Sequence, residues 1–216
     1  MGKAADGRGA GPGGVGVSAN GHEHARAPID CYPFVQQTSA HSEHFITDLA
    51  CTMKILVGDL FESQAQTLVN AVNCVGVMGK GIAEQFKRRF PAMFDDYKRR
   101  CKRKDVRLGE PYLYRDSSGI QLVNFPTKGH WRSPSRIADV EHGLDYLLEH
   151  AAEWNIASLA LPALGCGNGG LEWSDVGPLI YRKLNTLPID IEVYAPTGTS
   201  RQHLTTEFLS APSQRS

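Results

Sequence analysis

The sequence predicts an α/β fold in which a mixed sheet carries helices on both faces. Short apolar runs of strand length alternate along the chain with segments whose apolar residues recur at helical spacing. One β-hairpin is expected among these units, so one strand should run antiparallel to its neighbour. Two glycine-rich segments directly follow apolar runs, and in such sheets ligands bind beyond the carboxyl ends of the strands. The sequence therefore places a candidate site at that edge of the sheet.

Four apolar runs and one hairpin make up the predicted strands. The runs are residues 54–57, 66–70, 158–161 and 191–194, and the hairpin joins 112–114 to 120–123. The turn of the hairpin, Asp116–Gly119, consists of residue types that favour tight turns. The run at 54–57 is closed by Gly58 and Asp59, which predicts a turn directly after the first strand.

The predicted helices lie between these strands. Ile82, Phe86 and Phe90 are spaced four residues apart and share one helical face, and Pro91 interrupts that pattern. A second short helix follows, and two longer amphipathic helices are predicted after it. Their apolar positions are Met93, Phe94, Tyr97 and Cys101; Ile137, Val140, Leu144, Leu147, Ala151 and Trp154; and Val176, Leu179, Ile180 and Leu184.

The two ends of the chain differ from this periodic region. Residues 2–21 consist mainly of Gly, Ala and small polar types, which bury too little apolar surface to offset their ordering entropy. We therefore expect residues 1–52 to be disordered or a start-site extension ahead of Met53, residues 53–208 to form one domain, and 209–216 to be a flexible tail. The histidines and cysteines before Met53 lack zinc-site spacing, so no metal is expected. They are His22, His24, His41, His44, Cys31 and Cys51.

Composition excludes some protein classes and is neutral on the partner. Lys plus Arg and Asp plus Glu both total 23, and no apolar stretch approaches the length of a membrane helix. The five cysteines form no CxxC pair, which is typical of reduced thiols in the cytoplasm. We expect a cytoplasmic, monomeric protein without a cofactor or membrane contact.

The two glycine-rich loops are the candidate phosphate-binding elements. Residues 70–81 lie between a strand and a helix, where backbone N–H groups bind anions and glycines allow close approach. Cys74 and Gly81 stand where a P-loop needs a glycine and a hydroxyl, so a P-loop is excluded. Residues 164–173 contain a GxGxxG match, but no acid ends the next strand to hold a ribose, which disfavours a nicotinamide dehydrogenase. Either loop alone could be a structural turn; the pair predicts a diphosphate held between them.

Four segments resemble the macrodomain family, and within it the DarG-type DNA ADP-ribosyl glycohydrolase antitoxins. They are Val57–Phe61, Asn70–Ala83, Asn124–Lys128 and Leu164–Trp173, in the family's order. The resemblance implies a three-layer α/β/α sandwich with a mixed central sheet and with ADP-ribose in a cleft at one end.

The resemblance also implies roles for single residues. Asp59 would accept a hydrogen bond from the adenine amino group, Asn73 would contact the distal ribose, and Tyr194 would pack on the adenine. The alternatives are a capping aspartate, an asparagine that bonds its own backbone, and a core tyrosine. Further ADP-ribose contacts are expected from Leu60, Val77, Met78, Gly79, Gly81, Ile82, Thr127, Pro162, Gly165, Cys166, Gly167 and Asn168. Lys80 is expected to be solvated.

Lys128 and Asn73 are the residues that the resemblance makes catalytic. In related glycohydrolases a lysine at this motif attacks the anomeric carbon of the distal ribose. The attacking amine must be neutral, so its pKa must lie below the ordinary value of about 10.4. The alternative is a surface lysine in a turn. A subgroup that releases glutamate-linked ADP-ribose has an aspartate where this chain has Asn168-Gly169, which favours the DNA linkage here.

Two features bear on the substrate. Ten of the 23 basic residues lie between Lys87 and Arg107, which predicts either a nucleic-acid surface or a solvated helix face. Trp131 could stack on a flipped base or cap the core. We therefore expect a hydrolase that removes ADP-ribose from thymidine in DNA, with a cognate ADP-ribosyltransferase toxin as a partner. The alternatives are a non-catalytic ADP-ribose reader and a hydrolase of glutamate-linked ADP-ribose or ADP-ribose 1″-phosphate.

Overall fold

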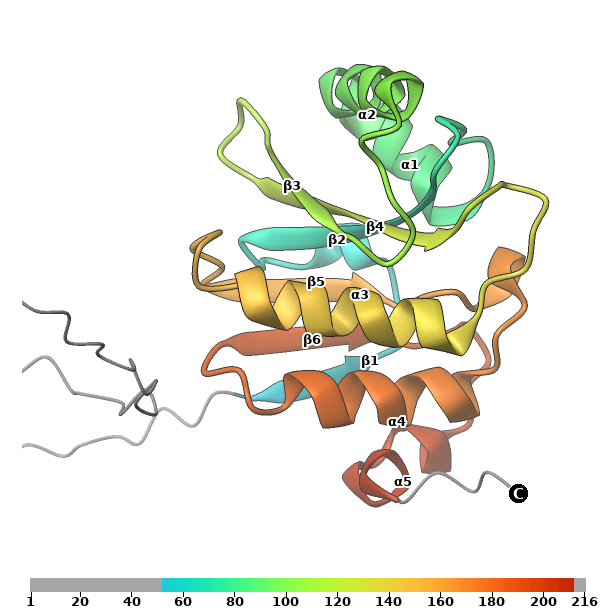
Figure 1. The fold of residues 1–216 in the computed structure, drawn as a ribbon. Coiled ribbons are helices and arrows are strands. Elements are labelled where there is room, and N and C mark those ends of the chain that lie inside the picture. Colours follow the sequence, from blue (N-terminus) through green and yellow to red (C-terminus); the bar gives the residue numbers. More distant parts are fainter. Residues whose placement is uncertain (1–51, 212–216) are drawn as a thin grey trace, which may run out of the picture. The chain divides into compact units, whose positions relative to one another are not determined.

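The computed structural model describes residues 52–211, which form three layers around a central sheet (Figure 1). The expected extension up to residue 51 lies outside the described residues, as do its histidines and cysteines and the last five residues of the expected tail.

The sheet has six strands in the order β1-β6-β5-β2-β4-β3. The strands are β1 (Met53–Leu56), β2 (Thr67–Asn73), β3 (Tyr112–Arg115), β4 (Gln121–Lys128), β5 (Ser158–Pro162) and β6 (Asp190–Tyr194). Only the hairpin pair β3–β4 is antiparallel; the other four pairs are parallel. The expected mixed sheet is confirmed. All strands except β3 consequently end at the same edge of the sheet.

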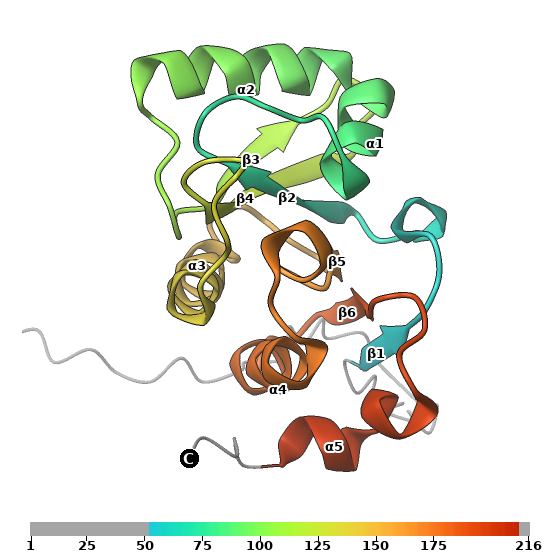
Figure 2. The ribbon, with the colours of Figure 1, turned by 90° about the vertical axis from the view of Figure 1, so that its right-hand side faces the viewer.

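Helices cover both faces of this sheet (Figure 2). On one side lie α1 (Gly81–Arg89) and α2 (Pro91–Arg103), and on the other lie α3 (Ile137–His150) and α4 (Trp173–Leu184). Three short 3₁₀ turns, η1 (Leu60–Glu62), η2 (Gly167–Gly169) and η3 (Arg201–Leu204), and the short helix α5 (Thr206–Ser210) complete the described part. Each helical layer packs its own apolar core against the sheet. The α/β/α sandwich is therefore confirmed.

The boundary between α1 and α2 follows directly from proline chemistry. Pro91 has no backbone N–H and occupies the first turn of α2, where that donor would be unpaired in any case. Phe90, with φ −128°, is the junction between the two helices. Phe86 and Tyr97 are both fully buried, so the two helices share one core.

The close approach of α3 to β4 depends on Gly143. Phe125 of β4 is fully buried, and its ring lies where a Cβ on Gly143 would stand. The helix backbone therefore rests directly on the aromatic ring. This contact sets the position of the strand that ends at Lys128.

Two helix ends differ from the expectation. α3 stops at His150, so Ala151 and Trp154 lie beyond it, although Trp154 still donates its backbone N–H to the His150 carbonyl at 2.9 Å. At the other end, α5 extends past Phe208, and Leu209 is buried in the core at 1% exposure. Ordered structure thus passes the boundary expected at 208, because tertiary packing holds a helix too short to show periodicity. Among helices in residues 52–211, none has the length and apolarity of a membrane span.

Candidate active site

A cavity of about 920 Å³ opens where the parallel strands end. The last residues of four strands line it: Asn73 of β2, Lys128 of β4, Pro162 of β5 and Tyr194 of β6. Both glycine-rich loops also contribute to its wall. Its volume is in the range of small-molecule sites, and its place is the one expected from the strand order.

All but one of the predicted site residues line this cavity. They are Asp59, Leu60, Asn73, Val77, Gly79, Gly81, Ile82, Thr127, Lys128, Pro162, Gly165, Cys166, Gly167, Asn168 and Tyr194. The exception is Met78, which is 2% exposed and belongs to the core beneath α1 and α2. Its sulfur lies 3.9 Å from the side-chain amide of Asn70. The Met78 side chain therefore supports the first loop from behind and does not face a ligand.

The sequence did not single out several lining residues. Arg132 and the stretch 195–197 are the main examples, together with Gly58, Ala71, Val72, Ala83, Gln85, Ala163 and Gly169. Residues 195–197 directly follow β6, so their position after a parallel strand was the available signal. Arg132 belongs to no motif, and the available signal was its place directly after Trp131 and four residues after Lys128. Lys80 and Trp131, which had been considered, also line the cavity.

The side chain of Asn73 is used within its own loop. Its Oδ1 accepts hydrogen bonds from the backbone N–H groups of Val75 and Val77 at 3.0 and 3.4 Å, and its Nδ2 donates to the Val77 carbonyl at 2.6 Å. The Tyr97 hydroxyl of α2 lies 2.7 Å from the Asn73 carbonyl oxygen and 3.0 Å from Oδ1. The structure thus shows the alternative in which this asparagine bonds its own backbone. Asn73 thus holds the loop; because it also lines the cavity, its contact with the distal ribose stays a prediction.

The first loop leads into α1, whose N-terminus faces the cavity. Lys80, the N-cap residue, makes no side-chain capping bond. The first N–H groups of a helix lack partners within the helix and carry partial positive charge, so they can bind an anion. Gly81 and Lys80 both line the cavity at this point.

The two glycine-rich loops meet at Gly81. A Cβ built on Gly81 would stand 3.2 Å from the Asn168 side-chain amide of the second loop, and the φ of Gly81 is +62°. Within the second loop Gly165 has φ +76°, and a Cβ there would come within 2.6 Å of Leu171. Only glycine fits such positions without strain. The expected convergence of the two loops on one site is confirmed.

One connection, residues 129–136 between β4 and α3, ties both loops together. The Cys74 N–H of the first loop donates to the Gly129 carbonyl at 3.1 Å. The Ser135 N–H donates to the Gly169 carbonyl of the second loop at 2.8 Å. This connection begins directly after Lys128, so the lysine and both loops form one hydrogen-bonded unit.

The Lys128 amine is held inside this unit. Its Nζ donates to the Asn168 carbonyl at 2.8 Å, which bridges the end of β4 to the second loop. Partial burial lowers the pKa of Lys128 below its ordinary 10.5, because a charged amine loses hydration there. Lys128 is therefore no freely solvated surface lysine, and its neutral form is more accessible than that of an ordinary lysine.

The remaining ionisable groups give the wall a positive balance. Lys80, Lys128 and Arg132 line the cavity together with one carboxylate, Asp59. The Asp59 Oδ1 caps η1 by accepting from the Phe61 N–H at 3.0 Å, as the capping alternative expected. A carboxylate retains further acceptor sites beyond that bond. A cavity of this charge suits a ligand with two phosphate groups and a neutral base.

The thiols and the tyrosine near the site are not nucleophiles. Burial, with Glu172 and Asp175 nearby, raises the pKa of the Cys166 thiol to about 11, and burial raises that of Cys74 to about 11. Both thiols stay protonated at neutral pH, and a protonated thiol is a weak nucleophile. Tyr194 donates its hydroxyl to the Glu192 carboxylate at 3.0 Å. Within residues 52–211 no His, Cys, Asp or Glu cluster is arranged to hold a metal ion.

Gly81→Ala should separate the two loops and weaken ADP-ribose binding. The added Cβ meets the Asn168 amide, and a left-handed backbone is strained for alanine, so we expect a loss of affinity on the order of 10-fold. Gly119→Ala is the matched control, since Gly119 has φ +90° but no atom within 4 Å of its Cβ and does not line the cavity. Calorimetric titration with ADP-ribose measures both variants. Equal affinity losses in the two would show that backbone strain alone, and not loop contact, is responsible.

Comparison with known proteins identifies the family. Residues 69–180, just over half of the chain, match the Macro domain family. A DNA ADP-ribosyl glycohydrolase of Mycobacterium tuberculosis is 48% identical over 149 residues, which cover 67% of this chain and 42% of that protein. A DNA ADP-ribosyl transferase-DNA ADP-ribosyl glycohydrolase fusion protein of Thermosipho africanus is 41% identical over 166 residues, 68% of this chain and 43% of the fusion protein.

A solved structure agrees with the sequence relatives. The structure of Thermosipho africanus DarTG in complex with ADP-ribose superposes with a TM-score of 0.70 at 41% identity, over 74% of this chain and 46% of that one. This chain spans less than half the length of these two curated relatives. Three observations lead to one assignment: the sandwich of helices and mixed sheet, the two converging glycine-rich loops, and the family match over residues 69–180. The chain belongs to the macrodomain family.

Proposed function

We propose that this macrodomain removes ADP-ribose from thymidine in single-stranded DNA, with Lys128 as the nucleophile. The observation that carries the proposal is the Lys128 amine, which lies 2.8 Å from Asn168 where both glycine-rich loops meet. The relatives named DNA ADP-ribosyl glycohydrolases, at 41 to 48% identity, support the reaction class. The related structure with bound ADP-ribose supports the ligand.

The strand order suggests how ADP-ribose lies in the cavity. The first loop follows β2 and the second follows β5, and these two strands are neighbours at the middle of the sheet. Asp59 and Tyr194 belong to the β1–β6 side, whereas Lys128 ends β4 on the other side. The diphosphate would lie across the loops, the adenine near Asp59 and Tyr194, and the distal ribose near Lys128. Backbone N–H groups of the loops suit the diphosphate, and a carboxylate suits an exocyclic amine.

In the proposed reaction the neutral Lys128 amine attacks the anomeric carbon of the distal ribose. The bond from that carbon to the thymine base breaks, its electron pair goes to the base, and the base takes up the proton that the lysine nitrogen releases. Water then displaces the lysine from the lysyl–sugar intermediate, which releases ADP-ribose and restores the amine. Burial lowers the pKa of Lys128, and this increases the fraction of amine that can attack at neutral pH. The Asn168 carbonyl orients the amine by accepting one of its hydrogens.

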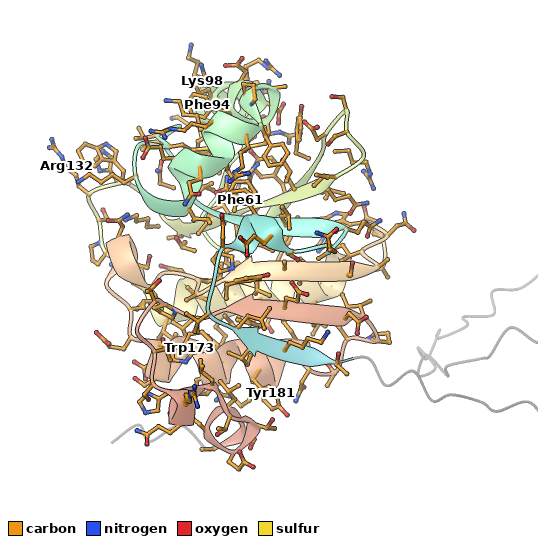
Figure 3. All side chains as sticks on the ribbon, turned by 180° about the vertical axis from the view of Figure 1, so that it is seen from behind. Phe61, Phe94, Lys98, Arg132, Trp173 and Tyr181 are labelled. Carbon is orange, nitrogen blue, oxygen red and sulfur yellow. The ribbon has the colours of Figure 1, made fainter. Side chains whose placement is uncertain are left out.

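The basic residues between Lys87 and Arg107 do not carry the DNA assignment. Seven of the ten form ion pairs with nearby carboxylates: Arg88, Arg89, Lys98, Arg99, Arg100, Arg103 and Arg107. None of the ten lines the cavity. Lys87 and Lys98 also lie over the Phe94 ring, with their Nζ atoms 4.7 and 4.8 Å from its centre. Figure 3 shows Lys98 beside Phe94. This pattern fits the solvated helix face better than a nucleic-acid surface.

We propose in addition a cytoplasmic location and an ADP-ribosyltransferase as the functional partner. The free thiols of Cys74, Cys101 and Cys166 suit a reducing compartment. The Thermosipho africanus relative joins a transferase and a glycohydrolase in one chain, which supports the partner. The monomeric state stays a prediction.

A side-by-side turnover assay tests the proposal. The substrates are a thymidine-linked ADP-ribosylated single-stranded oligonucleotide, a glutamate-linked ADP-ribosylated peptide and ADP-ribose 1″-phosphate. We expect release of ADP-ribose from the oligonucleotide, and slower or no release from the other two, since Asn168-Gly169 offers no carboxylate beside Lys128. Saturable ADP-ribose binding without turnover of any substrate would instead identify a reader. Faster turnover of the peptide or of the 1″-phosphate would reassign the linkage.

A further inference from the structure

Trp131 is an exposed aromatic side chain at the mouth of the cavity. It follows Lys128 by three residues, lines the cavity and is 44% exposed. It belongs to neither of the two apolar cores of residues 52–211. The structure therefore rejects the alternative in which Trp131 caps the core. An indole that is exposed beside the reacting end of a cavity has surface available for a ligand.

The connection that carries Trp131 is held at both ends. Gly129 is bonded to the first glycine-rich loop, and Ser135 is bonded to the second. Inside it, the Ser133 N–H donates to the His130 carbonyl at 3.0 Å, and the Arg132 N–H donates to His130 Nδ1 at 3.2 Å. Trp131 thus stands on a closed turn between fixed points. A backbone held in this way loses little further freedom when a ligand packs on the ring that it carries.

Arg132 adds a positive charge to the same place. Its guanidinium carbon lies 4.4 Å from the centre of the Trp131 ring, and both side chains line the cavity. Figure 3 shows Arg132 pointing outward from the edge of the sheet where the parallel strands end. An aromatic ring next to an arginine is the combination that holds single-stranded nucleic acid: the ring stacks on a base, and the cation attracts the backbone.

We propose that Trp131 and Arg132 form the subsite for the nucleobase and the adjoining phosphodiester of the substrate. The inference rests on the proposed function and extends it from ADP-ribose to the group attached to it. The group on the anomeric carbon must lie near Lys128, and Trp131 and Arg132, three and four residues further along the chain, line the same cavity. Trp131 stacks on the base next to the scissile bond, and Arg132 binds the phosphate beside that nucleotide. A glutamate side chain has no ring to stack, so this subsite selects a base-linked over a peptide-linked ADP-ribose.

Binding measured in the Lys128→Ala background tests this subsite, because the substrate stays intact. The probes are free ADP-ribose and the thymidine-linked ADP-ribosylated single-stranded oligonucleotide. Trp131→Ala should weaken oligonucleotide binding by roughly 5- to 100-fold and leave free ADP-ribose binding nearly unchanged, as expected for one lost base stack. Trp131→Phe should restore most of the loss. Arg132→Ala should make the affinity for the oligonucleotide less sensitive to salt. The slope of log Kd against log salt concentration should fall by the amount expected for about one lost phosphate contact. Val57→Ala is the control, since Val57 is 46% exposed and does not line the cavity.

Several outcomes would overturn the subsite. If Trp131→Ala binds the oligonucleotide as tightly as before, stacking on Trp131 is ruled out. If this variant loses as much affinity for free ADP-ribose as for the oligonucleotide, Trp131 is part of the ADP-ribose site itself. An equal loss for a glutamate-linked ADP-ribosylated peptide would show that the subsite does not recognise a base. These outcomes differ from failure of the proposed function. If the wild-type chain does not turn over the oligonucleotide but binds it through Trp131, the hydrolase is rejected and the subsite stands.

Discussion

Lys128→Ala is expected to slow release of ADP-ribose from the thymidine-linked oligonucleotide by on the order of 10³-fold or more. The variant removes the amine that attacks the sugar, whereas the groups assigned to the diphosphate are backbone N–H groups of the two loops. Binding of free ADP-ribose should therefore stay within a few-fold of the wild-type value. Single-turnover rates and calorimetric titration measure the two quantities separately. An active Lys128→Ala variant would end the assignment of Lys128 as the nucleophile.

Lys128→Arg is the matched control for this variant. Arginine retains a positive charge and a similar reach, but it stays protonated at every pH at which the protein is folded. If Lys128 served only as a cation, Lys128→Arg would keep most of the activity. We expect it to be nearly as inactive as Lys128→Ala.

The pH dependence has a defined sign. The attacking form is the neutral amine, so the rate should rise as the pH rises through the pKa of Lys128 and level off above it. Because burial lowers that pKa, the rise should be centred below 10.5. A rate that falls over this range would contradict the role of the neutral amine.

Phe125→Ala is expected to lower the free energy of unfolding by about 3–5 kcal/mol, the largest effect on stability that we predict. Phe125 is fully buried under α3, and alanine leaves a cavity below Gly143. Urea unfolding measures the loss. Because Phe125 lies three residues before Lys128 in β4, the same variant should also disturb the position of the amine.

The effect of Gly143→Ala on the free energy of unfolding should have opposite signs in the wild-type chain and in the Phe125→Ala variant. In the wild-type chain its Cβ overlaps the Phe125 ring, which we expect to cost about 1–3 kcal/mol. In Phe125→Ala the ring is gone, and alanine is the better helix former, so Gly143→Ala should stabilise that variant by up to about 1 kcal/mol. Equal effects of Gly143→Ala in both backgrounds would show that the two residues are not coupled.

The layered fold was predictable because it follows from periodicity. Apolar runs and helical faces placed the six strands and four longer helices, and Pro91 marked the start of α2. The helix α5 was not predictable in this way. It has five residues, and its stability comes from Leu209, which packs into a core built by distant parts of the chain.

The candidate site was predictable to the level of its loops but not of each side chain. The motifs identified the wall of the cavity, yet they could not show that Met78 turns into the core. For Asn73, the sequence allowed both a ligand contact and a local turn, and Tyr97, 24 residues away, takes part in the outcome. The ion pairs of α2 were easier to predict from the sequence, since Asp95 and Asp96 precede basic residues by three or four positions.

A crystal structure of the Lys128→Ala variant with ADP-ribose tests the central claim most directly. We expect the diphosphate to receive hydrogen bonds from backbone N–H groups at the start of α1 and in the second loop. The adenine should lie beside Asp59 and Tyr194, and the anomeric carbon should face position 128. ADP-ribose bound outside this cavity, or with its distal ribose at the Asp59 end, would contradict the account.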